Sequence, residues 1–247
     1  MTAPVFLHPN AAEAAAGARL TLDGPEGRHA VSVKRLRPGE ALTLTDGAGA
    51  GASATVVETV GKDRLLAEVV EPLREPLPEP WLTVVQALPK GDRGEVAVET
   101  MTETGVDAVV PWAAARCVTR WREERGAKAL AKWRSTAREA GKQARRLRFP
   151  EITDPVTTRQ LAALVAAADL AVVLHEEGDL PLATTELPGT GRILVVVGPE
   201  GGVAPEELAE LAAAGAVPRR LGRSVLRTST AGTAAAAVLL ARTGRWG

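Results

Sequence analysis

The chain has 247 residues, a formal net charge of zero at pH 7 and 45% hydrophobic residues, with no Tyr and two Phe. This length allows one large domain or two modest ones, and the single cysteine, Cys117, excludes an internal disulfide and a cysteine-cluster metal site. Three scattered histidines, a first segment without a signal-peptide pattern and the lack of a long charge-free apolar window lead us to expect a soluble, cytoplasmic protein without a metal.

The N-terminal region shows short apolar runs separated by turn signals such as Asp46-Gly47 and Gly61, a pattern that predicts β-strands. We expect strands at residues 19–22, 41–45, 52–60 and 64–70. Short strands without an intervening helical pattern indicate a small β-barrel rather than a βαβ unit.

Residues 27–40 concentrate basic side chains beside the apolar Val31, Val33 and Leu36. One interpretation is a short helix with a solvated charged face, and the other is a surface that contacts RNA phosphates. The basic side chains are Arg28, Lys34, Arg35 and Arg37.

Prolines at positions 72, 76, 78 and 80 interrupt residues 71–80. Such a stretch cannot continue a helix or lie in a central strand, because proline lacks the backbone N–H. We therefore expect a linker at 74–80 between an N-terminal domain of residues 1–73 and a C-terminal domain of residues 81–247.

The C-terminal domain alternates predicted strands with predicted helices. We expect strands at 81–88, 107–111, 169–174 and 192–197, and helices at 157–167 and 228–242 and after residues 92 and 204. Asp92 followed by Glu95 is typical of a capping box, and Gly105 is typical of a helix end. This alternation indicates a mostly parallel sheet covered by helices.

Ligands of such sheets lie at the carboxyl ends of the strands. This rule brings the loops that follow Leu174, Val197 and Leu221 together in space. His175, at the first of these strand ends, can be either a ligand contact or a structural residue.

Residues 116–148 are the most unevenly charged segment, with twelve Lys or Arg and three Glu. Apolar residues recur there at spacings of three and four, so a helix would bury one stripe and expose the charges. The stripe consists of Leu130, Trp133, Ala137, Ala140, Ala144 and Leu147. A charge run is usually a solvated face, but such faces mix signs, and a nearly all-positive face favours phosphate binding.

The segment Gly198-Pro199-Glu200-Gly201-Gly202 follows the buried strand 192–197 and precedes a helix that begins at Pro205. Two tight turns are the simple interpretation of its glycines. The segment lacks both common phosphate-binding signatures, and its central Glu200 would repel a phosphate. A ligand that carries positive charge, such as a sulfonium, would be tolerated there.

The same segment, followed by Leu221-Gly222-Arg223-Ser224-Val225-Leu226-Arg227-Thr228, resembles the paired signature of RsmE-type 16S rRNA uridine-N3 methyltransferases of the SPOUT superfamily. The resemblance implies a trefoil-knotted C-terminal α/β domain, an N-terminal PUA-like β-barrel that engages RNA, S-adenosylmethionine as cofactor, and a homodimer acting on 16S rRNA or the 30S subunit. Residues 27–40, 90–106 and 138–146 resemble further blocks of the family. The departures are Lys34, Glu99, Thr100, Lys142, Ala144 and Ser229.

The resemblance assigns the site residues. The cofactor-binding positions are Leu174, His175, Gly198, Pro199, Glu200, Gly201, Gly202, Leu221, Gly222, Val225, Leu226 and Thr228. The RNA-binding positions come from the charge pattern together with the resemblance: Arg28, Lys34, Arg35, Arg37, Lys90, Arg93, Arg145, Arg146 and Arg148. A side chain at Gly201 is expected to abolish donor binding, because it would fill space that only hydrogen occupies.

Methylation of uracil N3 requires an exposed base, loss of the N3 proton and in-line alignment with the donor methyl group. A cation near O2 or O4 would stabilise the uracil anion, and Arg227 is the first candidate; the alternative is a structural ion pair with Glu200 or Glu103. Glu200 can orient a proton path or accept backbone N–H bonds that hold its loop. The family often has Glu where this chain has Ser229, so the sequence offers no general base.

Three other functions remain open at this stage. The first is a SPOUT methyltransferase that acts on tRNA or on a ribose 2′-hydroxyl, because the cofactor loops do not identify the acceptor. The second is a non-catalytic RNA-binding protein of ribosome assembly. The third, a nucleotide-binding Rossmann-like enzyme, is disfavoured by the missing phosphate signatures.

Overall fold

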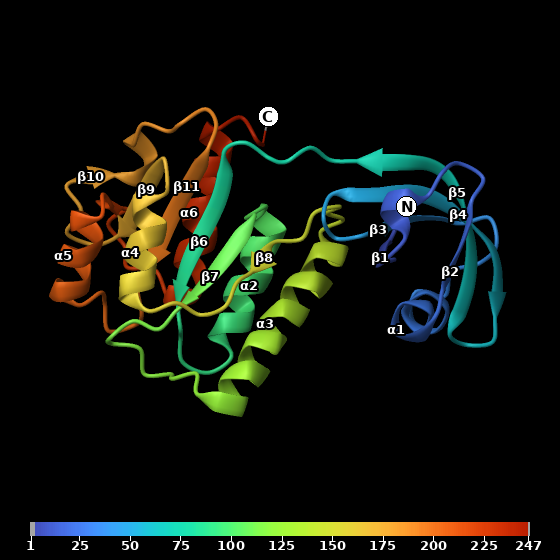
Figure 1. The fold of residues 1–247 in the computed structure, drawn as a ribbon, viewed down its shortest axis with the longest axis horizontal. Helices are drawn as coiled ribbons and strands as arrows, with labels where there is room; N and C mark the ends of the chain where they lie inside the picture. The colour runs from blue at the N-terminus through green and yellow to red at the C-terminus, as the bar shows by residue number, and fades with distance from the viewer. Residues whose placement is uncertain (1–2, 247) are drawn as a thin grey trace. The chain divides into compact units, whose positions relative to one another are not determined.

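The computed structural model of the protein describes residues 3–246, which form two compact units (Figure 1). Unit 1 consists of residues up to 77 together with 141–149, and unit 2 consists of 78–140 and the residues from 150 onward. The expected division kept residues 81–247 in one domain. It differs from the structure because the chain returns to unit 1 at residues 141–149.

Unit 1 is built on a five-stranded sheet in the order β1-β3-β4-β5-β2. The strands are β1 (Val5–Leu7), β2 (Arg19–Leu22), β3 (Ala41–Thr45), β4 (Ala50–Val60) and β5 (Arg64–Arg74). Only the pairing of β1 with β3 is parallel. Phe6, Leu42, Leu44 and Leu65 form the centre of its core.

Strand β5 continues through Pro72, which pairs with Ala52 of β4, so the predicted end at residue 70 is wrong. Strand β2 covers β5 only between Leu65 and Glu68. Pro72 therefore lies where β5 has a free edge, and an edge tolerates the missing N–H.

The basic stretch of unit 1 is helical. It comprises α1 (Gly24–Arg28) and a π-helical turn, η2 (His29–Val33), and a short 3₁₀ turn, η1 (Ala11–Glu13), lies earlier in the chain. The side chains of Arg28, Lys34, Arg35 and Arg37 are exposed.

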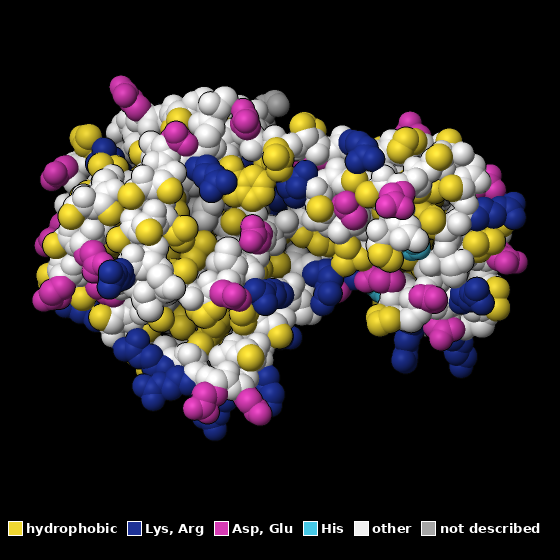
Figure 2. Space-filling view, viewed as in Figure 1, with side chains coloured by type: hydrophobic (Ala, Val, Ile, Leu, Met, Phe, Trp, Pro, Cys, Tyr) yellow, Lys and Arg dark blue, Asp and Glu magenta, His cyan; other side chains and the backbone are white. Residues whose placement is uncertain are grey.

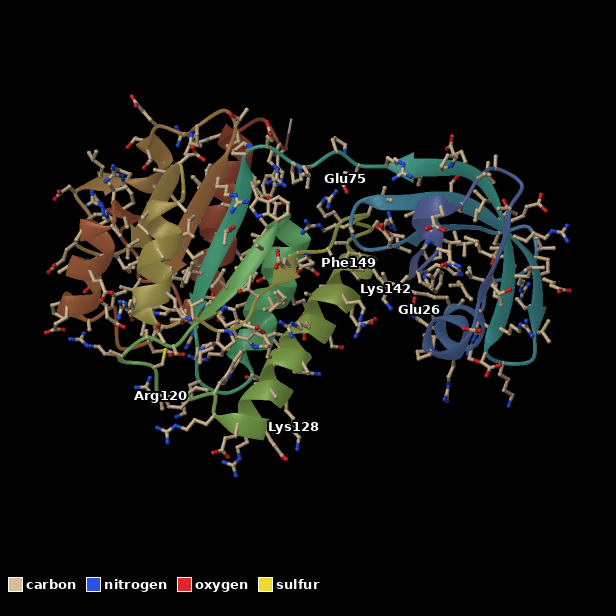
Figure 3. All side chains as sticks on the ribbon, viewed as in Figure 1. Glu26, Glu75, Arg120, Lys128, Lys142 and Phe149 are labelled. Atoms are coloured by element: carbon tan, nitrogen blue, oxygen red, sulfur yellow. The ribbon has the colours of Figure 1, made fainter. Side chains whose placement is uncertain are left out.

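Residues 141–149 are anchored to unit 1 by specific bonds. Lys142 is buried, and its Nζ donates to Glu26 Oε1 at 2.7 Å (Figure 3). Thr45 Oγ1 donates to the carbonyl of Leu147 at 2.7 Å, and the N–H of Phe149 donates to that of Gly47 at 2.9 Å. This segment is an integral part of unit 1.

Unit 2 contains a seven-stranded sheet in the order β10-β12-β9-β11-β6-β7-β8, and its strand pairs are parallel, as predicted. The strands are β6 (Trp81–Ala87), β7 (Ala108–Trp112), β8 (Glu151–Ile152), β9 (Leu170–Leu174), β10 (Leu180–Pro181), β11 (Arg192–Val197) and β12 (Val217–Arg220). The helices are α2 (Arg93–Thr104), α3 (Glu123–Gln143), α4 (Thr158–Ala166), α5 (Pro205–Ala213), α6 (Thr228–Arg242) and the 3₁₀ turn η3 (Leu182–Thr184). Helices α2 and α6 pack together on one face of the sheet, and α4 and α5 pack on the other (Figure 1).

The sequence predicted one helix end correctly and two others incorrectly. Gly105 ends α2 with a φ of 105°, as expected for a left-handed cap. The expected capping box of Asp92 is wrong, because its side chain makes no cap hydrogen bond. Helix α3 buries Leu130, Trp133, Ala137 and Ala140 but ends at Gln143, before the last two positions of the predicted stripe.

No helix within residues 3–246 is both long and apolar enough to cross a bilayer.

Candidate functional site

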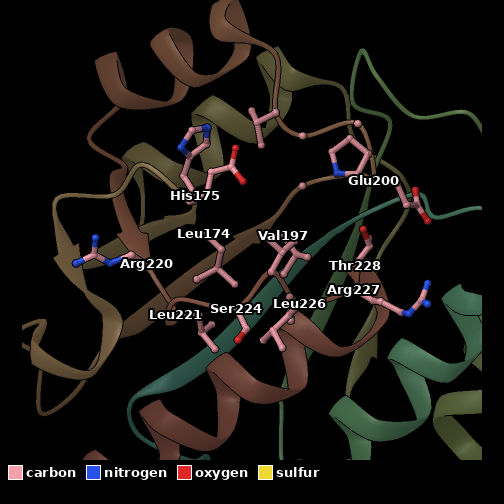
Figure 4. Close-up of a pocket in the computed structure, with 18 of the residues that line it drawn as sticks. Leu174, His175, Val197, Glu200, Arg220, Leu221, Ser224, Leu226, Arg227 and Thr228 are labelled. Carbon is pink, nitrogen blue, oxygen red and sulfur yellow. The ribbon is translucent and has the colours of Figure 1, made fainter.

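A cavity of about 800 Å³ lies in unit 2 at the carboxyl ends of β9, β11 and β12 (Figure 4). The predicted cofactor-binding residues all line it: Leu174, His175, Gly198, Pro199, Glu200, Gly201, Gly202, Leu221, Gly222, Val225, Leu226 and Thr228. They meet because β9 pairs in parallel with both β11 and β12, so the loops that follow these strands lie at one edge of the sheet.

The lining has apolar side chains in its middle, with His175 and Arg220 on one side of them (Figure 4). The side chains of Leu174, Val197, Leu221 and Leu226 gather in one part of the cavity (Figure 4). Glu200, Arg227 and Thr228 lie together on the other side in the same view. The cavity can therefore hold a ligand with a flat apolar part and a charged part.

The glycine-rich loop needs glycine at two of its positions. Gly202 has a φ of 74°, and its N–H donates to the carbonyl of Pro199 at 2.9 Å. A Cβ on Gly198 would lie 2.8 Å from Cγ2 of Val203. At Gly201 a Cβ would meet atoms of the chain only at 3.4 Å or more, so the fold itself does not require glycine there, and the effect of a side chain on donor binding stays a prediction.

Glu200 accepts hydrogen bonds that hold two loops together. Its Oε1 accepts the N–H of Lys90 at 3.2 Å and lies 3.8 Å from Nη1 of Arg93. Of the two roles considered for Glu200, these contacts favour the one that fixes the backbone. Arg93 lines the cavity, and Lys90 is exposed on the loop before α2.

Arg227 is the N-cap residue of α6 and lines the cavity. Its carbonyl accepts the N–H groups of Thr230 and Ala231, which fixes its backbone. Within residues 3–246 its guanidinium makes no hydrogen bond or ion pair, so the structural pair considered with Glu200 or Glu103 is not formed. Leu226 was expected to be buried, but it is 40% exposed because it faces the cavity.

His175 is held by backbone contacts. Its Nδ1 accepts the N–H of Glu177 at 3.2 Å, and its own N–H donates to the carbonyl of Arg219. A neutral imidazole with Nδ1 as acceptor carries its proton on Nε2. Cys117 does not line the cavity, and burial raises the pKa of its thiol, so this cysteine is unsuited to act as a nucleophile.

The remaining predicted RNA-binding residues lie in unit 1. Arg145 is exposed with a φ of 59°, just after the end of α3. Arg148 is half-buried, and its Nη2 donates to the carbonyl of Glu75 at 3.3 Å. Part of the Arg148 guanidinium is thus used within unit 1, whereas Arg145 remains accessible.

Sequence reasoning missed several residues of the site. Arg116 lines the cavity, and its Nη1 donates to the carbonyl of Gly201 at 3.1 Å. Buried Glu207 accepts from the N–H of Ala115 at 2.8 Å and from Thr158 Oγ1 at 2.7 Å. Its other oxygen accepts the N–H of Ala204 at 3.3 Å. One signal in the sequence could have identified them: the loop that follows β7 lies at the same edge of the parallel sheet as the loops that line the cavity.

Glu176, Arg220 and Arg223 also line the cavity, so cations outnumber carboxylates around it. Among residues 3–246 no cluster of three or more His, Cys, Asp or Glu could hold a metal ion. The site therefore offers arginines, backbone groups and an apolar surface.

Comparisons with known proteins match nearly the whole chain. A family model described as an RNA methyltransferase domain matches residues 75–240, and one described as an RNA methyltransferase PUA domain matches residues 22–70. The chain is 45% identical over 234 residues to the ribosomal RNA small subunit methyltransferase E of Mycobacterium bovis, covering 93% of this chain and 89% of that protein. It is 30% identical to the Bacillus subtilis protein of the same name, covering 85% of each chain.

Two solved structures of methyltransferases also match nearly the whole chain. The crystal structure of a ribosomal RNA small subunit methyltransferase E from Neisseria gonorrhoeae bound to S-adenosyl methionine matches with a TM-score of 0.86 at 28% identity, covering 98% of both chains. A putative methyltransferase from Legionella pneumophila in complex with the same cofactor matches with a TM-score of 0.84 at 29% identity, again covering 98% of both chains.

Proposed function

The chain belongs to the ribosomal RNA small subunit methyltransferase E family, and from this premise we propose that it transfers a methyl group from S-adenosylmethionine to N3 of one uridine in 16S rRNA, on the assembled 30S subunit. The observation that carries the proposal is that the segments 198–202 and 221–228 line one cavity. The cytoplasm, where ribosomal subunits are assembled, is the proposed location.

The residues present fit S-adenosylmethionine. At Gly202 no atom beyond the residue's two chain neighbours lies closer than 3.9 Å to the position of a Cβ, so the loop backbone is open to close approach there. Leu174 and Leu221 offer apolar surface to an adenine ring. A volume of about 800 Å³ is within the usual size of cofactor sites. When bound, the cofactor supplies an electrophilic methyl group on a sulfonium, so the protein has to supply position and electrostatics.

Two features of the cavity would stabilise a uracil anion. Helix α6 begins at the cavity with Thr228, and its N-terminus carries partial positive charge. Arg227, directly before it, has a free guanidinium on a fixed backbone. We therefore assign Arg227 to hold the developing charge on a uracil oxygen, which lowers the free energy of the anion that attacks the methyl group.

No general base is assigned. Glu200, the carboxylate closest in the chain to the glycine turns, is engaged by the N–H of Lys90 and by Arg93. Ser229 is buried in the first turn of α6 and cannot supply a carboxylate. Solvent water takes the N3 proton as the anion forms, Arg227 stabilises the anion, and Glu200 is a positioning residue for the cofactor loop.

We propose that the exposed basic residues of both units contact rRNA. In unit 1 these are Arg28, Lys34, Arg35, Arg37 and Arg145, and Arg146 and Arg148 are only half-buried. In unit 2 they include Lys90, and Arg93 is half-buried beside Glu200. Such contacts bind the phosphate backbone and position the subunit without reading its sequence.

We expect a homodimer. Helix α6 is rich in Ala, and Val238, near its end, is only partly buried in the single chain. Small residues permit close approach of another helix, and the trefoil knot that the resemblance implies packs against its copy in related proteins. Light scattering at micromolar concentration should give twice the mass of one chain; a stable monomer would contradict this expectation.

The function is tested on 30S subunits from a strain that lacks this methyltransferase. Incubation with the enzyme and labelled donor, followed by nucleoside mapping, should give N3-methyluridine at a single position in 16S rRNA. Gly202→Val serves as the cofactor-deficient control, because φ near 74° is strained for a β-branched residue. Methylation of a ribose 2′-hydroxyl, or of tRNA but not the subunit, would refute the assignment.

A further inference from the structure

The loop between β7 and α3, residues 113–122, is fixed against its neighbours at the cavity. Thr119 Oγ1 donates to the carbonyl of Pro89 at 2.8 Å. Arg116 donates to the carbonyl of Gly201 at 3.1 Å. The backbone N–H of Lys90, next to Pro89, donates to Glu200. Hydrogen bonds therefore join the three segments 88–92, 113–122 and 198–204 to one another.

The interior contacts of residues 113–122 use two large side chains. Trp121 packs edge-on against Trp133 of α3, with ring centroids 4.9 Å apart. Arg120 donates to the carbonyls of Ala114 and Ala115 at 3.0 and 2.8 Å, so its guanidinium closes the loop on itself (Figure 3). The loop thus has a defined conformation that does not depend on a ligand.

Two cations of the loop remain available to a ligand. Arg116 uses one Nη1 hydrogen bond within the chain and lines the cavity with the rest of its guanidinium. Arg122 is exposed, and its guanidinium makes no hydrogen bond or ion pair within residues 3–246. The nearest acids in sequence are Glu123, which makes no ion pair within residues 3–246, and Glu124, which lies 3.8 Å from Lys128. Figure 2 shows basic side chains around the beginning of α3, with acidic side chains among them.

We propose that Arg116 and Arg122 bind phosphates of the RNA strand that carries the target nucleotide into the cavity. The identity of the nucleic acid rests on the proposed function. A base that enters an enclosed site must leave its stack, and its flanking phosphates have to be held while it does. The arginine fork matches phosphate oxygens. Arg116 lines the cavity, and Arg122 lies six residues further along the same loop, so the two side chains can hold successive parts of one strand.

Arg116 and Arg122 belong to the charge run that predicted phosphate binding, but not to the RNA-binding positions named from the sequence. The positive excess of residues 116–148 is divided between the units, and residues 141–149 belong to unit 1. Arg148 there is partly used by the carbonyl of Glu75. Within residues 3–246, Arg116 is the cation of this run that lines the cavity, and Arg122 lies on the same loop.

The test compares salt dependence of RNA binding among full-length variants. Affinity for a labelled single-stranded RNA of about 20 nucleotides is measured at several salt concentrations, because each phosphate contact adds about 0.7 to the slope for single strands. Arg122→Gln should make the slope shallower by about 0.7, and the double change with Arg116→Gln by about 1.4. Arg159→Gln, on an exposed position of α4, is the matched control and should leave the slope unchanged.

Donor affinity, measured by calorimetry, separates the outcomes. Arg122→Gln should leave it unchanged, since Arg122 contacts neither the cavity nor the glycine-rich loop. Wild-type salt slopes for Arg122→Gln and for the double variant would overturn the proposal. A loss of donor affinity in Arg116→Gln without a change in slope would show that Arg116 only holds Gly201. Binding is read without methyl transfer, so a wild type that binds RNA but does not methylate 30S subunits refutes the proposed function alone.

Discussion

Replacement of Arg227 by lysine should lower the single-turnover rate by roughly 10²–10³, the scale on which one preorganised donor acts in a transition state. Affinities for S-adenosylmethionine and for the 30S subunit should stay close to those of the wild type. The reason is that the interaction strengthens only as charge develops on the uracil.

The change from arginine to lysine tests the geometry of the side chain at position 227 and leaves its charge in place. Arg227 has a fixed backbone, because its carbonyl accepts two N–H groups of α6, and no acid of residues 3–246 neutralises its guanidinium. An arginine in this position can direct two parallel N–H groups at a planar acceptor. Lysine keeps the positive charge but loses the fork, so the substitution separates geometry from charge.

The rate is measured with donor and 30S subunit both saturating, and Arg159→Lys on α4 is the control for a generic effect of the substitution. If Arg227 served only the fold, donor affinity and thermal stability would fall together while turnover at saturation stayed. A rate within about threefold of the wild type, well under the scale of a lost donor, would remove Arg227 from the catalytic step.

The predicted cavity follows from simple rules, because strands 169–174 and 192–197 are continuous apolar runs and a parallel sheet brings their carboxyl ends together. The family comparisons confirm the PUA-like N-terminal domain and the α/β methyltransferase domain, and the knot stays a prediction from the resemblance. Strand β12 carries Pro218 and two arginines, so no apolar pattern marks it. It is defined by its pairing with β9.

The end of α3 shows why another part could not be predicted. The apolar stripe continues through Ala144 and Leu147, and nothing local stops the helix at Gln143. The departure depends on Lys142 meeting Glu26, a residue 116 positions away, and on Thr45 bonding to Leu147. Arg116 and Glu207 were missed for the same reason, since their roles lie in contacts between loops that are distant in sequence.

A buried ion pair between Arg245 and Asp107 holds the C-terminal segment in unit 2. No sequence motif predicts this pair. Arg245 donates to both oxygens of Asp107, at 2.6 and 3.0 Å, and to the carbonyls of Pro80 and Gly105, each at 3.2 Å. The Asp107 side chain has no exposed surface, and it also accepts the N–H of Leu82 at 2.8 Å. The pair ties the chain end to the beginnings of β6 and β7.

Arg245→Ala should lower the free energy of unfolding of unit 2 by about 3–5 kcal/mol, because it leaves the Asp107 carboxylate buried without its partner. Urea unfolding followed by tryptophan fluorescence reports this unit alone, since Trp81, Trp112, Trp121, Trp133 and Trp246 all belong to it. Arg159→Ala, at an exposed position of α4, should change the free energy by less than about 0.5 kcal/mol.

The double variant Arg245→Ala with Asp107→Asn decides whether the orphaned charge is the cause. Asparagine removes the buried charge and can still accept the N–H of Leu82, so the second substitution should restore part of the lost stability. Such a result gives a coupling energy of about 1–3 kcal/mol between the two sites, as expected for residues in direct contact. If the two substitutions were additive, or if Arg245→Ala cost less than about 1 kcal/mol against the expected loss, the pair would not stabilise unit 2, and the end of the chain would be held by the packing of α6 instead.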